Sequence, residues 1–298
     1  MKKKIFIMAC LAVLGIQVVK AQIAALALHH QGKVTMYNAQ NFDAMMTAAA
    51  AGDTIYVSSG SITTDINITK KLTFIGAGQE TIIHGTVSVA IPDSVTLTSR
   101  LLQNLRINGD VKIDAPIAGM TIDKCRMNNI SFNANIDASS IISCYVGDKL
   151  TLSDKIKGLS IYTTKINNID GECANANNAN FVNCNINENC PKATYVNCII
   201  LRAYNGGSSG LTNCLYYYSE TFGGSISCWR NTSLNFDNGL NATGVDLANY
   251  IGTDGTVVGV TGTTNPYTLT PTTPKVLTHA LSVDEVGSTL SVTLTVGN

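Results

Sequence analysis

The chain has 298 residues, of which 45% are apolar and only 13% are charged. It is long enough to bury a large core, but it has too little charge for the surface of an ordinary globular protein. Asn, Thr, Ser and Gly must therefore supply its polar surface, and these residues suit turns and exposed sheet faces better than helices.

The N-terminal segment has the pattern of a signal peptide. Lys2–Lys4 precede an apolar run over residues 5–19, and small residues surround a cleavage point before Gln22. A lipoprotein signal acylated at Cys10 is the alternative, but few apolar residues precede that cysteine. We expect residues 1–21 to be removed on export, which places the protein in the periplasm, outside the cell or at its surface.

Removal of the signal leaves the mature chain slightly acidic. It takes four lysines from the 20 basic residues, so 16 face 20 acidic ones and the formal charge becomes −4. We therefore expect no nucleic acid partner. No later apolar run reaches the length of a membrane-spanning helix.

A repeat of about 20 residues runs through the middle of the chain. Each unit reads apolar, two polar, small or apolar, any residue, apolar, and then Asn or Gly. The fourth position is occupied in turn by Leu105, Cys125, Cys144, Thr164, Cys184, Cys198, Cys214 and Cys228. Short β-rich units with this spacing are typical of coils that stack about 4.8 Å apart. We predict an all-β chain, with a single-stranded right-handed parallel β-helix over residues 22–267.

Two columns of the repeat carry specific expectations. The fourth position should point inward, so its six cysteines are predicted to be buried thiols, and only Cys173 and Cys190 are considered for a disulfide. The closing position is predicted to take a positive φ at a sharp bend, which Asn and Gly tolerate. It is occupied by Asn108, Asn128, Gly147, Asn167, Asn187 and Asn231.

Both ends of the coil are predicted to carry extra elements. A short amphipathic helix over residues 41–51 should cap the N-terminal end, with Gly52 stopping it. Residues 268–298 read as a linker followed by two strands, over 276–280 and 289–296. We expect this β-hairpin tail to pack against the solenoid, because a lone hairpin is marginal in water.

The N-terminal part of the repeat region resembles a known family. A small helix, then Gly52–Val57, then Leu72–Gly78 resemble the cap and first coils of the pectin-lyase-like β-helix superfamily. Gly252–Val260 followed by Asn265–Tyr267 is similar to the end of the helix in secreted β-helix proteins of Bacteroidota-type bacteria. The resemblance covers about residues 36–268 and implies the fold. This fold hosts lyases, hydrolases, esterases and adhesins, so it does not imply one activity.

The carboxylates do not form the clusters that the enzymes of this superfamily use. Such enzymes group acids on neighbouring coils to hold Ca²⁺ or to act as acid and base. This chain has no Asp-Asp pair. Asp148, Asn168 and Glu188 are predicted to share a column near Asp170 and Glu172, which would bind Ca²⁺ weakly or, as we favour, be solvated turn residues. We therefore expect no cofactor, and a role other than catalysis.

Two groups of side chains are candidates for ligand binding. The outward column after the inward position holds Arg106, Arg126, Tyr145 and Lys165, a stripe suited to an anionic sugar unless Asp123 neutralises it. The second group is aromatic and lies in the last coils, where Trp229 is the candidate platform for a sugar ring. Its other members are Tyr195, Tyr204, Tyr216, Tyr217, Tyr218 and Phe222.

These patterns favour a secreted or cell-surface β-helix with a binding or structural role. A polysaccharide or a cell-surface glycan is the expected partner, through glycan binding or adhesion. The alternative is a polysaccharide lyase or glycoside hydrolase acting on an acidic polysaccharide.

Overall fold

The computed structural model describes residues 23–92, 95–97, 100–202, 210–217 and 226–270, and the backbone of 275–284 and 289–297. The expected signal peptide, residues 1–21, lies outside the described residues. Within them, no helix is both long enough and apolar enough to cross a membrane.

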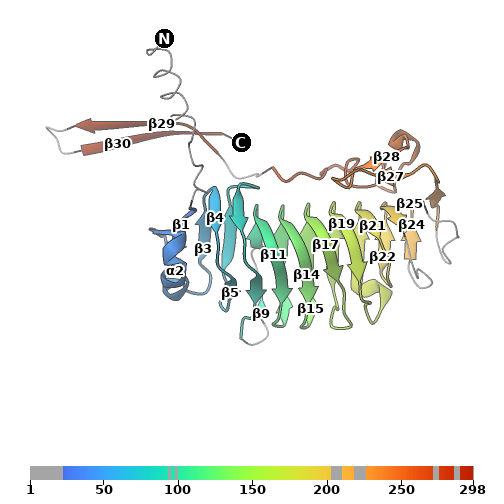
Figure 1. The fold of residues 1–298 in the computed structure, drawn as a ribbon, viewed down its shortest axis with the longest axis horizontal. Helices are drawn as coiled ribbons and strands as arrows, with labels where there is room; N and C mark the ends of the chain where they lie inside the picture. The colour runs from blue at the N-terminus through green and yellow to red at the C-terminus, as the bar shows by residue number, and fades with distance from the viewer. Residues whose placement is uncertain are drawn as a thin grey trace, which may run out of the picture.

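The described chain folds as the predicted parallel β-solenoid, with two long sheets whose strands alternate along the sequence (Figure 1). The 11-stranded first sheet runs in the order β2 (Lys33–Asn38), β1 (Ala25–His30), β3 (Thr54–Val57), β6 (Thr73–Gly76), β10 (Arg100–Gln103), β13 (Thr121–Asp123), β16 (Ser139–Ile142), β18 (Leu159–Tyr162), β20 (Ala179–Val182), β22 (Thr194–Val196) and β24 (Gly210–Thr212).

The 12-stranded second sheet lies opposite the first. Its strands are β4 (Gly60–Ile62), β5 (Ile66–Ile68), β7 (Thr81–Ile83), β8 (Val87–Val89), β11 (Arg106–Ile113), β14 (Arg126–Phe132), β17 (Tyr145–Thr151), β19 (Lys165–Asp170), β21 (Asn185–Glu188), β23 (Ile199–Arg202), β25 (Leu215–Tyr216) and β26 (Trp229–Arg230). A short third sheet joins β9 (Val95–Thr96), β12 (Ile117–Ala118) and β15 (Ile136–Asp137).

The predicted capping helix is present near the N-terminus, but it is shorter than expected. It forms α2 (Phe42–Ala48) and buries Phe42 and Met45. It ends because Ala49 is already extended, with ψ at 139°. Strands β1 and β2 form an antiparallel pair at the same end, and β1 also pairs antiparallel with β3.

The fourth position of the repeat points inward, as predicted. Leu105, Cys125, Thr164 and Cys184 are fully buried, and Cys228 in the last coil is half-buried. The eight cysteines in the described part of the chain are thiols, including Cys173 and Cys190, for which a disulfide was considered. Burial raises the pKa of the Cys125 thiol to about 12. The column therefore serves as small apolar core.

The prediction of a positive φ at the closing Asn and Gly column is wrong. The left-handed position is the residue just before the inward one, for example Asn104 with φ 55° and Asn183 with φ 55°. The chain bends there to pass from the first sheet to the second. Apart from Asn231, which follows β26, the closing column instead lies inside the second sheet, where the register shifts between Ile107 and Asp110 and between Val146 and Lys149. Asn and Gly occupy these bulges, and Asn187 Nδ2 donates to Asn167 Oδ1 at 2.8 Å.

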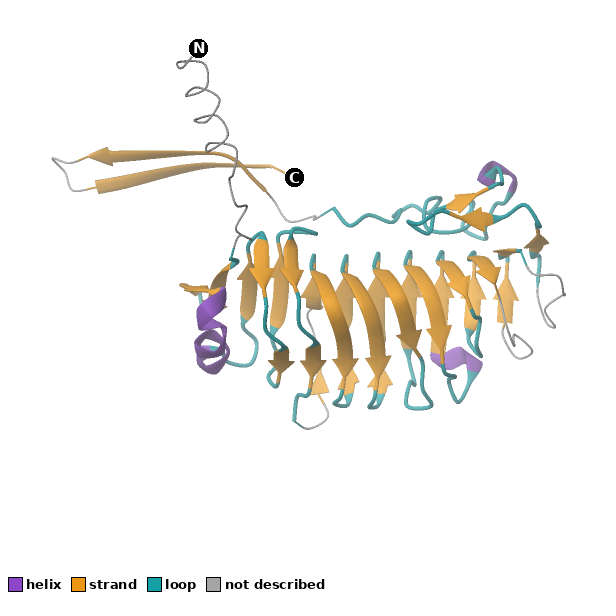
Figure 2. Cartoon of the chain, in the orientation of Figure 1, coloured by secondary structure: helices purple, strands orange, loops and turns teal. Residues whose placement is uncertain are grey.

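After β26 the chain turns back and runs along the outside of the solenoid, as Figure 2 shows. We call residues 234–270 the return segment. It contains the short antiparallel pair β27 (Asn235–Phe236) and β28 (Ala242–Thr243). Leu234 and Val258 are buried against Ile199, Leu201 and Leu215 of the second sheet, which fixes the segment to the last coils.

The predicted C-terminal hairpin is also present. Strands β29 (Lys275–Asp284) and β30 (Thr289–Gly297) pair antiparallel.

The left-handed bend gives a test at Asn213, whose φ is 49°. Asn213→Val should lower the free energy of unfolding by about 1–2 kcal/mol, because a β-branched residue is disfavoured in this region. Asn213→Gly should cost less, since glycine accepts a positive φ. Urea denaturation of both variants measures the difference. Equal stabilities would show that the bend does not constrain this residue.

Candidate functional site

The four residues of the predicted cationic stripe lie side by side on the outer face of the second sheet. Arg106 is in register with Arg126, Arg126 with Tyr145, and Tyr145 with Lys165, on β11, β14, β17 and β19. Their alignment is confirmed, and their role in ligand binding stays a prediction.

The first half of the stripe is open. Arg126 is exposed, and its guanidinium carbon lies 4.8 Å from the centre of the Tyr145 ring. Arg106 is half-buried and donates from Nε to Asn108 Oδ1 at 3.0 Å. The two cations therefore keep unused donors on the outer face, because each guanidinium has five N–H groups.

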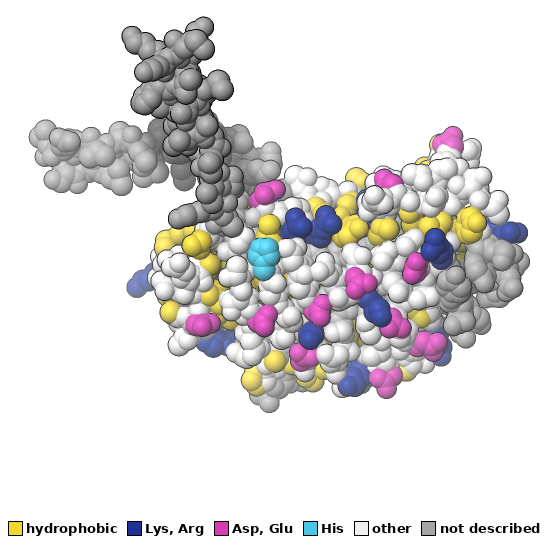
Figure 3. Space-filling view, viewed as in Figure 1, with side chains coloured by type: hydrophobic (Ala, Val, Ile, Leu, Met, Phe, Trp, Pro, Cys, Tyr) yellow, Lys and Arg dark blue, Asp and Glu magenta, His cyan; other side chains and the backbone are white. Residues whose placement is uncertain are grey.

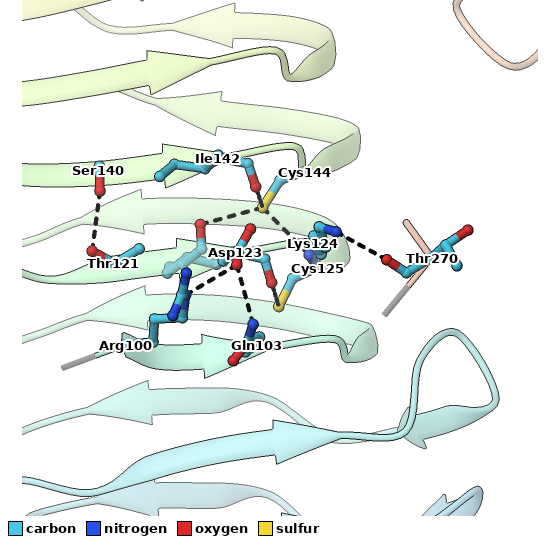
Figure 4. Close-up of polar contacts among 11 residues, drawn as sticks. Arg100, Gln103, Thr121, Asp123, Lys124, Cys125, Ser140, Ile142, Cys144 and Thr270 are labelled. Atoms are coloured by element: carbon cyan, nitrogen blue, oxygen red, sulfur yellow. Dashed lines mark hydrogen bonds and ion pairs between the residues drawn. The ribbon is translucent and has the colours of Figure 1, made fainter. Parts of the chain in front are cut away.

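Asp123 was the acidic partner considered for these arginines, and the structure places it elsewhere. It lies at the end of β13 in the first sheet, where it accepts from Arg100 Nε at 3.0 Å and Gln103 Nε2 at 3.2 Å (Figure 4). Its charge is thus paired with Arg100.

The second half of the stripe is covered by the return segment. Lys165 is only 6% exposed, and its Nζ donates to Asn241 Oδ1 and to Gly239 O, the latter at 3.0 Å. The ammonium also lies 4.5 Å from the centre of the Tyr267 ring. Burial lowers the pKa of Lys165, and the nearby Asp237 carboxylate partly opposes this shift. Lys165 therefore anchors the return segment to strand β19.

Asn185, next in the same column, holds the return segment in a similar way. Its Nδ2 donates to Leu240 O at 2.8 Å, and its Oδ1 accepts from Val260 N at 3.2 Å. The two anchors thus hold the return segment over β19 and β21.

The aromatic candidate Trp229 lies on β26 and packs against the return segment. It is half-buried and meets Tyr250 edge-on, with ring centres 5.8 Å apart. Tyr195 and Tyr216 are buried, whereas Tyr217 is 42% exposed. Tyr204, Tyr218 and Phe222 lie outside the described residues. The side chains described in these last coils thus mostly pack, and they do not form a flat platform.

A polar cleft of about 350 Å³ opens between the second sheet and the return segment. One wall and the floor come from β17, β19, β21 and β23, and the other wall comes from residues 235–240. Tyr145, which is half-buried, lies at the edge of this cleft, and its hydroxyl donates to Asn238 O at 3.5 Å. The cleft is lined by Tyr145, Gly147, Asn167, Asn187, Leu201, Arg202, Asn235, Phe236, Asp237, Asn238 and Leu240. Figure 3 shows acidic and basic side chains interspersed over this face of the molecule.

The polar groups of the cleft match the hydroxyls of a sugar. Asn167 and Asn187 form a short ladder of amides, which can both donate and accept hydrogen bonds. Arg202 lies 3.3 Å from Glu188 Oε1 and is 58% exposed, so donors remain for a ligand. Hydrogen bonds from Asn241 lower the pKa of Asp237, which therefore stays ionised as an acceptor.

The weak Ca²⁺ site considered for Asp148, Asn168 and Glu188 does not form as a column. The bulge at Gly147 moves Lys149, in place of Asp148, opposite Asn168. Lys149 Nζ then bonds Asp170 Oδ2 at 3.2 Å. No group of three or more His, Cys, Asp or Glu side chains in the described part of the chain is arranged to hold a metal ion.

Phe236, Asp237 and Asn238 were not foreseen, because they reach the site by the return of the chain. One sequence signal pointed to this cover. Alternation of buried and exposed residues stops at Ile199–Leu201, where three consecutive apolar residues are all buried. A strand buried on both faces requires a layer on each side.

Comparison with known proteins does not extend this description. No family model matches the chain, and no curated protein or solved structure matches it. Its function is therefore argued from the geometry of the polar cleft and its surroundings.

The Lys165 anchor can be tested by Lys165→Met, which keeps the apolar stem and removes the charge. We expect the free energy that holds residues 237–241 in place to fall by about 1–3 kcal/mol, because two acceptors lose a charged donor. Hydrogen exchange of that segment measures the loss. The matched control is Lys149→Met, whose exposed ion pair should contribute less than about 1 kcal/mol. Equal protection in both variants would mean that Lys165 is not the anchor.

Proposed function

We propose that the chain is an exported glycan-binding protein of the pectin-lyase-like β-helix kind. It holds a stretch of acidic polysaccharide along the outer face of the second sheet, with Arg106 and Arg126 at one end and the polar cleft at the other. The observation that carries the proposal is the continuity of these groups: Arg126 lies against Tyr145, and Tyr145 lines the cleft.

The size of this surface suits a short run of sugars. From Arg106 to the coil of Arg202 the sheet rises by five strand steps, or roughly 24 Å at about 4.8 Å a step. Arginine pairs bidentately with a carboxylate, so the two stacked cations fit the uronate groups of an acidic polymer. Tyr145 and Phe236 add apolar ring surface, which can pack against a sugar ring.

The charges of the cleft favour binding over hydrolysis. Glycoside hydrolysis needs two carboxyl groups, one of them held protonated by a raised pKa. Of the described residues that line the cleft, only Asp237 carries a carboxylate, and its pKa is lowered. An ionised Asp237 accepts hydrogen bonds from sugar hydroxyls but cannot act as a general acid. A lyase or hydrolase acting on an acidic polysaccharide is the second candidate function.

Calorimetric titration of the mature protein with polygalacturonate and alginate at low ionic strength tests the proposal. We expect weak binding that falls as salt is added, because exposed charges are screened. The double variant Arg126→Gln, Arg202→Gln should bind roughly 3- to 10-fold more weakly, from the loss of two exposed charge contacts.

The matched control removes two positive charges from the N-terminal cap, by Lys33→Gln and Lys71→Gln, both of which are exposed. It should bind as the unmodified protein does. Equal weakening in both double variants would reduce the effect to net charge. No binding of either polymer would refute the proposal, and new ultraviolet absorbance during incubation would identify a lyase instead.

A further inference from the structure

An apolar hollow of about 640 Å³ lies far from the polar cleft, on the outer face of the first sheet. It is formed by β1, β3 and β6 with the edge strand β2. Two large side chains rise from it, Met36 with 65% and Tyr56 with 46% of their surface exposed. Its lining includes four small residues, Ala25, Ala27, Gly76 and Ala77. An exposed apolar surface of this kind usually marks a contact site.

The return segment travels toward this hollow. Thr253 N donates to Asn197 Oδ1 at 3.0 Å, and Asp254 Oδ2 accepts from Asn183. Further along, Thr270 O accepts from Lys124 Nζ at 3.0 Å, as Figure 4 shows. Between residues 253 and 270 the chain thus moves from the coil of β22 back to the coil of β13, along the ridge of left-handed bends.

The hollow lies on the same path, two coils beyond Thr270. The strand order of the first sheet is β13, β10, β6, so the remaining distance along the axis is about 10 Å at roughly 4.8 Å a step. Strand β29 begins at Lys275. Five residue steps from Thr270 can span about 16 Å in an extended chain, so the hairpin can start at the hollow.

The pairing of the hairpin concentrates apolar residues on one side. Leu281 is in register with Val292, and Val283 is in register with Leu290. The alternate pairs are polar or small, for example Ser282 with Ser291. Since successive residues of a strand occupy opposite faces, one face of the hairpin is apolar. A two-stranded hairpin is marginal by itself in water, so this face requires a cover.

We propose that the apolar face of β29 and β30 docks onto the hollow beside Met36 and Tyr56 in the same chain. Figure 1 shows the hairpin at the same end of the molecule as β1 and β3. The short tether from Thr270 gives an effective concentration in the millimolar range, which favours the hairpin of the same chain over that of a second copy. Docking would cover the apolar hollow and the hairpin together, and it is independent of glycan binding.

Hydrogen exchange of the mature protein, read by mass spectrometry at residues 275–297, tests this contact. Docked strands should exchange at least about tenfold more slowly than in the double variant Met36→Asp, Tyr56→Asp, which places charge in the hollow. Both side chains are largely exposed, so the solenoid should keep its own protection at β14 to β19. The control is Tyr162→Asp on the same sheet, a residue that is 40% exposed and outside the hollow; it should leave the hairpin protected.

Three outcomes would overturn the proposal. A hairpin that exchanges freely in the unmodified protein is not docked, and one whose protection survives the double variant is docked elsewhere. Protection that rises with protein concentration, together with a dimer mass in light scattering, would make a second copy the occupant.

Discussion

The structure depends on backbone hydrogen bonds between successive coils. In the second sheet Arg126 N donates to Leu105 O at 2.9 Å, Tyr145 N to Cys125 O at 2.9 Å and Lys165 N to Cys144 O at 3.0 Å. No coil could satisfy its own peptide groups, because the N–H and C=O groups of its strands point along the axis toward the neighbouring coils. This ladder places equivalent residues of successive coils directly above one another, in columns of side chains.

The return segment covers one part of the outward column that begins at Arg106 and leaves the other part exposed. Arg106 and Arg126 lie outside the cover, Tyr145 at its edge donates from its hydroxyl to Asn238 O, and Lys165 and Asn185 hold the return segment. The column continues through Ile199 and Leu215, which are buried beneath that segment, to the half-buried Trp229. The polar cleft lies where the return segment begins to separate from the second sheet. The proposed binding surface thus exists because the return segment covers only part of the second sheet. If the segment covered the whole sheet, the cations would be buried. Without the segment, the sheet would be flat and would have no cleft.

The repeat was enough to predict the solenoid, the inward cysteines and the register of the cationic stripe, since all three follow from local periodicity. The bend position was missed because Asn suits both a left-handed residue such as Asn104 and a bulge such as Asn108. Asp148 was misplaced because a single extra residue at a bulge shifts the register, and sequence spacing does not reveal it. The second wall of the cleft was beyond prediction, since Asp237 and Tyr145 meet only through a return of the chain over 90 residues of sequence, which no repeat encodes.

The stacking of cysteines in the inward column can be tested by counting thiols on the denatured, unreduced mature protein. Six of the eight described cysteines occupy that column, in two runs on neighbouring coils that Thr164 separates. Parallel stacking sets their Cβ atoms about 4.8 Å apart, beyond the usual reach of a disulfide. We expect eight reactive thiols after denaturation. Before denaturation the thiols should react slowly, because only the thiolate reacts and burial raises the pKa of residues such as Cys190, to about 12. Fewer than six thiols would mean that cysteines of the column are paired, and would contradict the stacked coils.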